Sequence, residues 1–340
     1  MGGAIAISCR YGVRNLQEAQ RCTDGLEDDD ADLTPEKGKY FRALSQHGLA
    51  LLSKLPFEST ASSIEDLALY FACIAAFSSS KDTWNSKQSH QTSSHLLTQL
   101  RTAIDEQQAS DVLAEVLRRR VKPAFAKDSK PQPGSDIEPK PWKTQHVYMP
   151  TVLHCILNLA RQVDNDEQTP ETLWFRDEDA QRNFVHANWP LLVPSILTLI
   201  DDPSMKYKTA GCLDLRIFLS RIKGETIERT GLGEIFEKTL LQCLSNLPSL
   251  TKEDDSIMLL DEAYPALMEL TDVRFKDRKG RKTKVKSFDK IMHQGILRGF
   301  SMAGEHVRVA ELLSVHAKRL VREMGIDSAP YLKVSFPAQQ

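Results

Sequence analysis

The feature that most constrains this chain is a series of apolar stripes with helical spacing. From residue 189 onward, apolar residues recur three and four positions apart within stretches of helical length. This spacing places them on one face of an α-helix, because the helix has 3.6 residues per turn. Two such stretches follow each other directly, Leu232 to Leu247 and Ile257 to Leu270. No stretch alternates apolar and polar residues as a half-buried strand would, so the sequence predicts an all-α fold.

The clearest pair of predicted helices comprises residues 189–200 and 205–222. The turn between them contains Asp202, which is expected to cap the second helix, and Lys208 follows on that helix. Antiparallel pairs of this kind bury their stripes against one another and stack into an α-solenoid. The pair resembles a HEAT repeat. We therefore predict a HEAT/armadillo-like α-solenoid of antiparallel helix pairs, with a non-repetitive helical bundle as the alternative.

Composition divides the chain into four parts. Residues 1–33 end in an acidic cluster and are expected to be weakly ordered. Residues 34–125 form a predicted N-terminal helical region, in which the Ser-rich stretch 78–94 favours a loop. Residues 126–143 contain four prolines with charges between them, which is typical of an extended linker. Residues 144–335 form the predicted HEAT-like repeat domain.

Charge, hydropathy and cysteine spacing indicate the cellular compartment in which the protein acts. The chain has 44 Lys and Arg against 46 Asp and Glu, and this balance argues against a wholly basic nucleic-acid binder. The longest apolar run, Leu67 to Phe77, is shorter than the ~20 residues that a membrane span needs. The six cysteines are scattered without a C-x-x-C pair, which predicts buried free thiols and no zinc site. We expect a protein of the cytoplasm or the nucleus, without a membrane segment.

Catalytic motifs are incomplete. The stretch from Gly299 through Ser301 to Gly304 is one residue too long for a nucleophile elbow. Gly231-Leu232-Gly233 lacks the third glycine of a dinucleotide-binding loop, and the sequence contains no phosphate-binding loop. We therefore expect no catalytic residue, no cofactor and no metal. An enzyme with an unfamiliar helical active site is the alternative, and a deep pocket with perturbed titratable groups would indicate it.

One segment, residues 274–290, is strongly basic. Gly280 lies in its middle, so the segment is expected to be a loop that joins two helices. Its positive charge has three alternative interpretations: a solvated connection, a docking patch for an acidic partner or a nuclear-import signal. The candidate partner-binding residues are Arg274, Lys276, Arg278, Lys279, Arg281, Lys282, Lys284 and Lys286.

Nucleic-acid binding by the same segment is disfavoured. Only Phe275 and Phe288 are available there to stack on bases, and the whole chain has a net charge of −2. A helical-repeat transport or nucleic-acid adaptor that uses residues 274–290 is nevertheless the alternative function.

Several sequence blocks together carry a family resemblance. They are Trp189 to Pro194, Leu199 to Asp202, Thr230 to Leu232 with Phe236-Glu237, Leu244 to Thr251, Ala263 to Leu267, and Gly304 to His306. With these blocks the chain resembles the Tel-two-interacting protein two family in its fungal form. The resemblance extends over roughly residues 189–330, and the first half matches more loosely.

The resemblance implies a non-enzymatic, HEAT-like scaffold of the Triple T co-chaperone complex. Its partners would be the other Triple T subunits, which are large helical-repeat proteins. With a heat-shock chaperone system, the complex supports the stability of phosphatidylinositol-3-kinase-related kinases, and so DNA-damage signalling and telomere maintenance. Family members usually continue through further helices after Gly325-Ile326, so this chain is expected to lack C-terminal helices.

Overall fold

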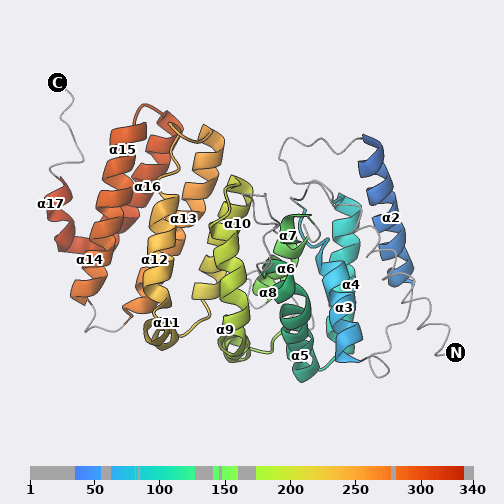
Figure 1. The fold of residues 1–340 in the computed structure, drawn as a ribbon. Coiled ribbons are helices and arrows are strands. Elements are labelled where there is room, and N and C mark those ends of the chain that lie inside the picture. The colour runs from blue at the N-terminus through green and yellow to red at the C-terminus, as the bar shows by residue number, and fades with distance from the viewer. Residues whose placement is uncertain are drawn as a thin grey trace, which may run out of the picture. The chain divides into compact units, whose positions relative to one another are not determined.

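The computed structural model describes residues 35–54, 63–80, 82, 85–126, 141–144, 148–159, 174–276 and 281–332. These residues form helices joined by turns, with no strand among them, which confirms the all-α prediction (Figure 1). The chain divides into two compact units, residues 1–195 and 196–340. The predicted segment 1–33 and residues 127–140 of the predicted linker lie outside the described part. No helix in the described part is long and apolar enough to cross a bilayer.

The N-terminal unit is built around α3, whose apolar face packs against α4, α5 and α8. Phe71 at its centre is fully buried and meets the ring of Trp174 edge-on, with the ring centroids 5.1 Å apart. The helices are α2 (Pro35–Ser53), α3 (Ile64–Ala75), α4 (Lys87–Ala103), α5 (Glu106–Val116), the π-helical turn η2 (Leu117–Val121), α6 (Lys122–Phe125), α7 (Pro141–Thr144), α8 (Met149–Leu159) and α9 (Glu178–Ile200), which crosses the unit boundary.

The loop that was expected over residues 78–94 is shorter in the structure, because α4 already begins at Lys87. The hydroxyl of Ser86 accepts a hydrogen bond from the backbone N–H of Ser89 and so caps the helix. Ser93 is buried, and its Oγ donates to the carbonyl oxygen of Ile74 over 2.6 Å. The serines that favoured a loop therefore cap this helix and attach it to α3.

The two ends of the Pro-rich stretch meet inside the N-terminal unit. Trp142 on α7 is 1% exposed and stacks on Phe125 at the end of α6, with ring centroids 5.4 Å apart. The chain therefore leaves and re-enters the same packed surface on either side of residues 127–140.

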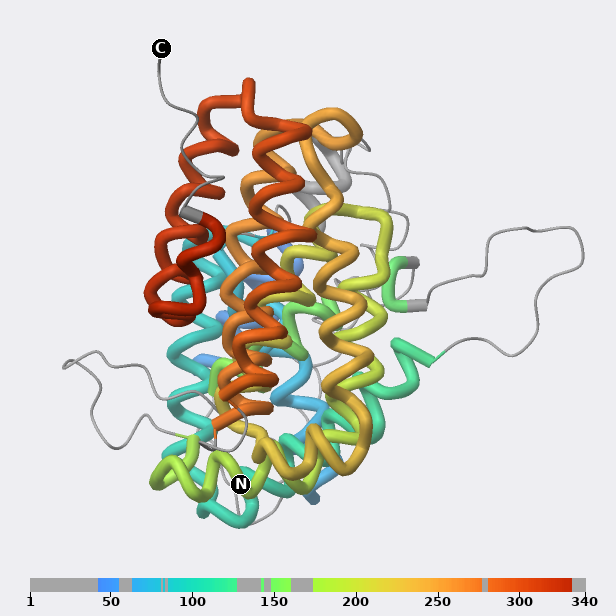
Figure 2. The backbone as a smooth tube through the Cα atoms, turned by 90° about the vertical axis from the view of Figure 1, so that its left-hand side faces the viewer, coloured from blue at the N-terminus to red at the C-terminus, as the bar shows by residue number. Residues whose placement is uncertain are grey.

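The C-terminal unit is built around α13, which contacts α10, α12, α14 and α16 (Figure 1). Figure 2 shows these helices, coloured from yellow to red, running beside one another. Gly231 has a φ of 69°, a conformation that favours glycine, and turns the chain between α11 and α12. The elements are α10 (Met205–Leu219), α11 (Gly224–Thr230), α12 (Leu232–Cys243), α13 (Glu253–Arg274), α14 (Arg281–Ile291), the π-helical turn η5 (Met292–Leu297), α15 (Arg298–Ala303), α16 (Val307–Met324), the 3₁₀ turn η6 (Gly325–Ser328) and α17 (Ala329–Leu332).

The turn before α10 is stabilised differently from the expectation. Ser204 occupies the N-cap position, so the prediction that Asp202 caps α10 is wrong. Asp202 is fully buried and accepts a hydrogen bond from the backbone N–H of Ser204 over 3.0 Å. Lys208 donates from Nζ to the carbonyl oxygen of Ile200 over 2.7 Å, at the end of α9. Asp202 therefore shapes the turn, and Lys208 satisfies a carbonyl that the end of α9 leaves free.

The described cysteines agree with the prediction of buried thiols. Cys73, Cys155, Cys212 and Cys243 are buried thiols that form no disulfide bond, while Cys9 and Cys22 lie outside the described residues. Burial raises the pKa of both Cys73 and Cys155 to about 12. These two thiols therefore stay protonated at neutral pH and are poor nucleophiles.

A buried histidine lies between α13 and α16. The ring of His316 stacks on Tyr264, with centroids 4.7 Å apart, and only 5% of the residue is exposed. Its Nε2 has no hydrogen-bond partner. Burial lowers the pKa of His316 from 6.5 to about 4, although the charge of Asp261 acts in the opposite direction. The folded protein therefore holds this ring neutral.

We expect the free energy of unfolding to fall as the pH drops from 6.5 towards 4, because the unfolded chain takes up a proton at His316 that the folded chain does not. A His316→Phe variant keeps a ring against Tyr264 and should lose this contribution, which is up to about 1.4 kcal/mol per pH unit. Urea denaturation at a series of pH values, followed by circular dichroism, measures the effect. An unchanged pH dependence in the variant would contradict the assignment.

Candidate functional site

The basic segment forms a helix over most of its length. The connection between α13 and α14 includes only residues 275–280, so the expectation of a loop over 274–290 is wrong. Ser287, Phe288 and Ile291 are buried along one side of α14, and this stripe holds the helix against the unit. Arg274 ends α13, Lys276 follows it, and Arg281, Lys282, Lys284 and Lys286 lie on α14, while Arg278 and Lys279 are outside the described residues.

Arg274 is held inside the unit by three carboxylates. Its side chain is 10% exposed and forms ion pairs with Glu228 at 3.1 Å, Glu234 at 2.6 Å and Glu237 at 3.4 Å. Lys290 reaches Glu237 from α14 at 3.1 Å. Arg274 therefore connects the end of α13 to α11 and α12, and its guanidinium is not available to a partner.

Lys284 also has partners within the unit. Its Nζ lies 2.6 Å from Asp272 Oδ1 on α13 and 3.9 Å from Glu323 Oε2 on α16. Arg281 is 72% exposed and reaches Asp327 only at 3.8 Å. Lys276, Lys282 and Lys286 are exposed, and the described residues provide no ion-pair partner for any of them.

The aromatic rings near this surface do not form a stacking platform for bases. Phe288 is fully buried. Phe275 is partly exposed, but the guanidinium of Arg274 lies over its ring, 5.1 Å from the centroid. Single-stranded nucleic acids are bound by exposed aromatic faces together with positive charge. The geometry therefore weakens the nucleic-acid alternative further.

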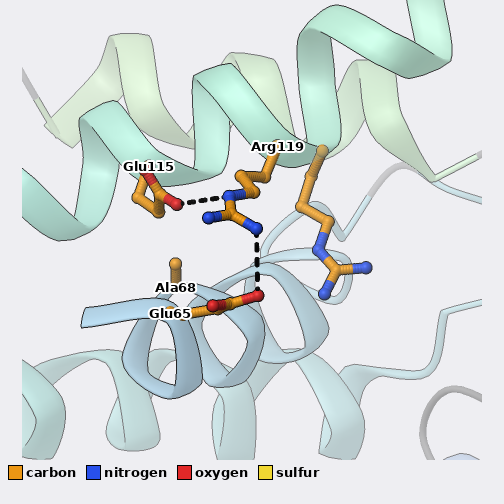
Figure 3. A pocket seen from close by; sticks show the side chains of 5 residues that line it. Glu65, Ala68, Glu115 and Arg119 are labelled. Atoms are coloured by element: carbon orange, nitrogen blue, oxygen red, sulfur yellow. Dashed lines mark hydrogen bonds and ion pairs between the residues drawn. The ribbon is translucent and has the colours of Figure 1, made fainter. Parts of the chain in front are cut away.

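A separate open pocket of about 230 Å³ lies in the N-terminal unit (Figure 3). Arg119 crosses it, with Nε 2.7 Å from Glu115 Oε1 and Nη1 3.2 Å from Glu65 Oε1. Ala68 and Arg120 also line the pocket. None of the five is a serine, threonine, cysteine, lysine or histidine, so the pocket lacks the usual nucleophiles of covalent catalysis other than carboxylates.

Sequence reasoning missed this pocket because its two sides are about 50 residues apart in the chain. Glu65 and Ala68 come from α3, whereas Glu115 and Arg119 come from α5 and η2. The one local signal is the run Arg118-Arg119-Arg120, which coincides with the π-helical turn. Such turns occur often at functional positions, but the sequence pattern alone does not reveal one.

The histidines and carboxylates of the described residues do not assemble into a metal-binding group. His90 and His95 both lie on α4. The Nδ1 atom of His306 lies 3.1 Å from Oε2 of Glu253. When the His306 ring is protonated, the two side chains form an ion pair between the starts of α16 and α13. Ser301 lies on α15, in a helix and not after a strand.

Comparison with known proteins connects this chain to one family. The model of the Tti2 family matches residues 71–339. A protein of Saccharomyces cerevisiae named TEL2-interacting protein 2 is 28% identical over 159 residues, which is 43% of this chain and 38% of that protein. The aligned part thus spans well under half of the yeast protein. No solved structure matches the chain.

Proposed function

Because this chain belongs to the Tti2 family, we propose that it is a non-enzymatic adaptor subunit of the Triple T co-chaperone complex. In this proposal it binds the other Triple T subunits along helical surfaces. The assembly, together with a heat-shock chaperone system, then supports the maturation and stability of phosphatidylinositol-3-kinase-related kinases. The chain would act in the cytoplasm and the nucleus, and its loss would affect DNA-damage signalling and telomere maintenance through the kinases.

The observation that carries this proposal is the family match over residues 71–339. That range includes most of both structural units, so the likeness is not limited to one short motif. The name of the yeast relative states an interaction with TEL2. The helical structure supports the proposal, because helical-repeat proteins provide long binding surfaces without needing a catalytic centre.

We expect the full chain, tagged and expressed at its natural level, to co-purify with a Tel2-like protein in constant proportion. Mass spectrometry of the bound proteins measures this, and a tagged helical protein of another family is the control. Depletion of the chain should also lower the steady-state amount of the kinases, measured by immunoblotting. Recovery of the chain alone from extracts at every concentration would contradict the proposal.

A further inference from the structure

We propose that an exposed basic strip, defined as Arg281, Lys282 and Lys286 on α14 together with Lys276 after α13, binds an Asp- and Glu-rich segment of a partner protein. The continuous helical stretch from Arg281 to Ala303 contains six lysines and arginines and one carboxylate, although the chain as a whole carries a net charge of −2. That single carboxylate, Asp289, accepts a hydrogen bond from the hydroxyl of Tyr331. The stretch therefore exposes positive charge that its own residues do not neutralise.

The structure separates the cations that stabilise the fold from those that are free. Arg274, Lys284 and Lys290 pair with carboxylates of neighbouring helices. Lys282 and Lys286 are exposed and have no ion-pair partner among the described residues. Stable folding of the unit therefore does not require the charges of Lys282 and Lys286, which makes them suitable for contact with another molecule.

The free lysines form a row. Lys282 and Lys286 are four residues apart, which places them on adjacent turns of one helix face. The buried residues Ser287, Phe288 and Ile291 hold the helix from its other side. Lys276 precedes Arg281 by five residues, so the chain limits their separation to roughly 18 Å. The strip thus presents several cations over a length that a short extended or helical acidic segment can follow.

The chemistry of the strip favours carboxylates of a protein over nucleic acid. Of the two phenylalanines of the basic segment, Phe288 is buried and Phe275 is covered by Arg274, so neither offers bases a free ring face. Lysine ammonium groups, in contrast, pair with carboxylates as mobile point charges and need no preformed pocket. Long-range attraction between such a strip and an acidic segment also accelerates their encounter.

The test uses the full chain and a fluorescein-labelled, glutamate-rich peptide, with binding followed by fluorescence anisotropy at low salt. The variant is Lys282→Glu with Lys286→Glu. The matched control is Lys238→Glu with Lys318→Glu, which changes the net charge equally at two exposed lysines of α12 and α16. Circular dichroism confirms that both variants remain folded. We expect the affinity for the peptide to fall roughly tenfold in the strip variant and to change little in the control.

Three outcomes would overturn the proposal. The first is the absence of peptide binding to the unmodified chain. The second is an equal loss in both variants, which would show attraction to net charge alone. The third is tighter, strip-dependent binding of a single-stranded oligonucleotide with the same charge as the peptide, which would assign the strip to nucleic acid. The assay contains no Triple T subunit besides this chain, so its result is independent of the proposed function.

Discussion

Replacement of Arg274 by alanine is expected to lower the free energy of unfolding of the C-terminal unit by roughly 3 kcal/mol. The Arg274 side chain is 10% exposed, and the side chain of Glu237, one of its partners, is 13% exposed. Without Arg274, Glu237 would depend on Lys290 alone for its positive partner. Breaking a buried ion pair is costly mainly because the remaining charge is uncompensated. Glu228 and Glu234 are 51% and 68% exposed, so water can solvate them and they contribute less.

Measurement of this effect must distinguish the two units. The four tryptophans all precede residue 196, so their fluorescence reports on the N-terminal unit. Hydrogen exchange followed by mass spectrometry on peptides of α12 and α13 reports on the C-terminal unit directly. Lys282→Ala, which removes an exposed cation from the same basic segment, is the matched control and should change stability by less than about 0.5 kcal/mol. Equal effects of the two substitutions would contradict the structural role of Arg274.

Gly233→Ala provides a sharper test, because the sign of its effect on stability should depend on whether Arg274 is present. A Cβ at Gly233 would lie 2.5 Å from Nε and 2.8 Å from Cζ of Arg274. Gly233→Ala should therefore displace the guanidinium from its carboxylates and destabilise the protein. In the Arg274→Ala background those atoms are gone, and alanine is favoured over glycine in a helix by up to about 1 kcal/mol. Destabilisation by Gly233→Ala in both backgrounds would show that another contact causes it.

The longer amphipathic helices could be predicted from the sequence, because they bury an apolar stripe. On α13, Leu260, Tyr264 and Leu267 recur at helical spacing and are all buried. The start of α4 could not be predicted in this way, since its buried Ser93 depends on a carbonyl of α3 for its hydrogen bond. Apolar periodicity indicates which face of a helix is buried, whereas polar residues at helix ends depend on their tertiary neighbours.

The candidate site shows the same contrast between features that are visible in the sequence and contacts that depend on tertiary neighbours. The basic character of residues 274–290 is visible in the sequence, but the roles of the individual residues are not. Glu237 and Glu323, which contact Arg274 and Lys284, lie 37 and 39 residues away from them in the chain. No local pattern identifies such long-range pairs, so sequence reasoning treated structural and free cations alike. Only the packing of α13 and α14 against their neighbours separates the two groups of cations.

Gly211→Ala is expected to destabilise the C-terminal unit by roughly 2 kcal/mol, through crowding of a closely packed turn. Gly211 is buried within α10, where alanine would otherwise be favoured by about 1 kcal/mol. A Cβ there would lie 2.7 Å from both the backbone nitrogen and Cγ1 of Ile200, and 2.9 Å from Cβ of Leu199. The end of α9 cannot retreat easily, because Lys208 donates to the carbonyl oxygen of Ile200 and Asp202 shapes the turn that follows.

The atoms that crowd Gly233 and Gly211 differ in kind, and this difference determines the control for Gly211→Ala. The atoms that crowd Gly233 belong to a side chain, so removing that side chain should relieve the strain fully. At Gly211 one of the closest atoms is the backbone nitrogen of Ile200, which no substitution removes. Adding Ile200→Ala to Gly211→Ala should therefore relieve only part of the crowding, and it also creates a cavity at a fully buried residue. Urea denaturation followed by circular dichroism, with hydrogen exchange on peptides that cover residues 199–211, measures both variants. Stabilisation by Gly211→Ala alone would show that helix propensity outweighs the close approach of α9 and α10.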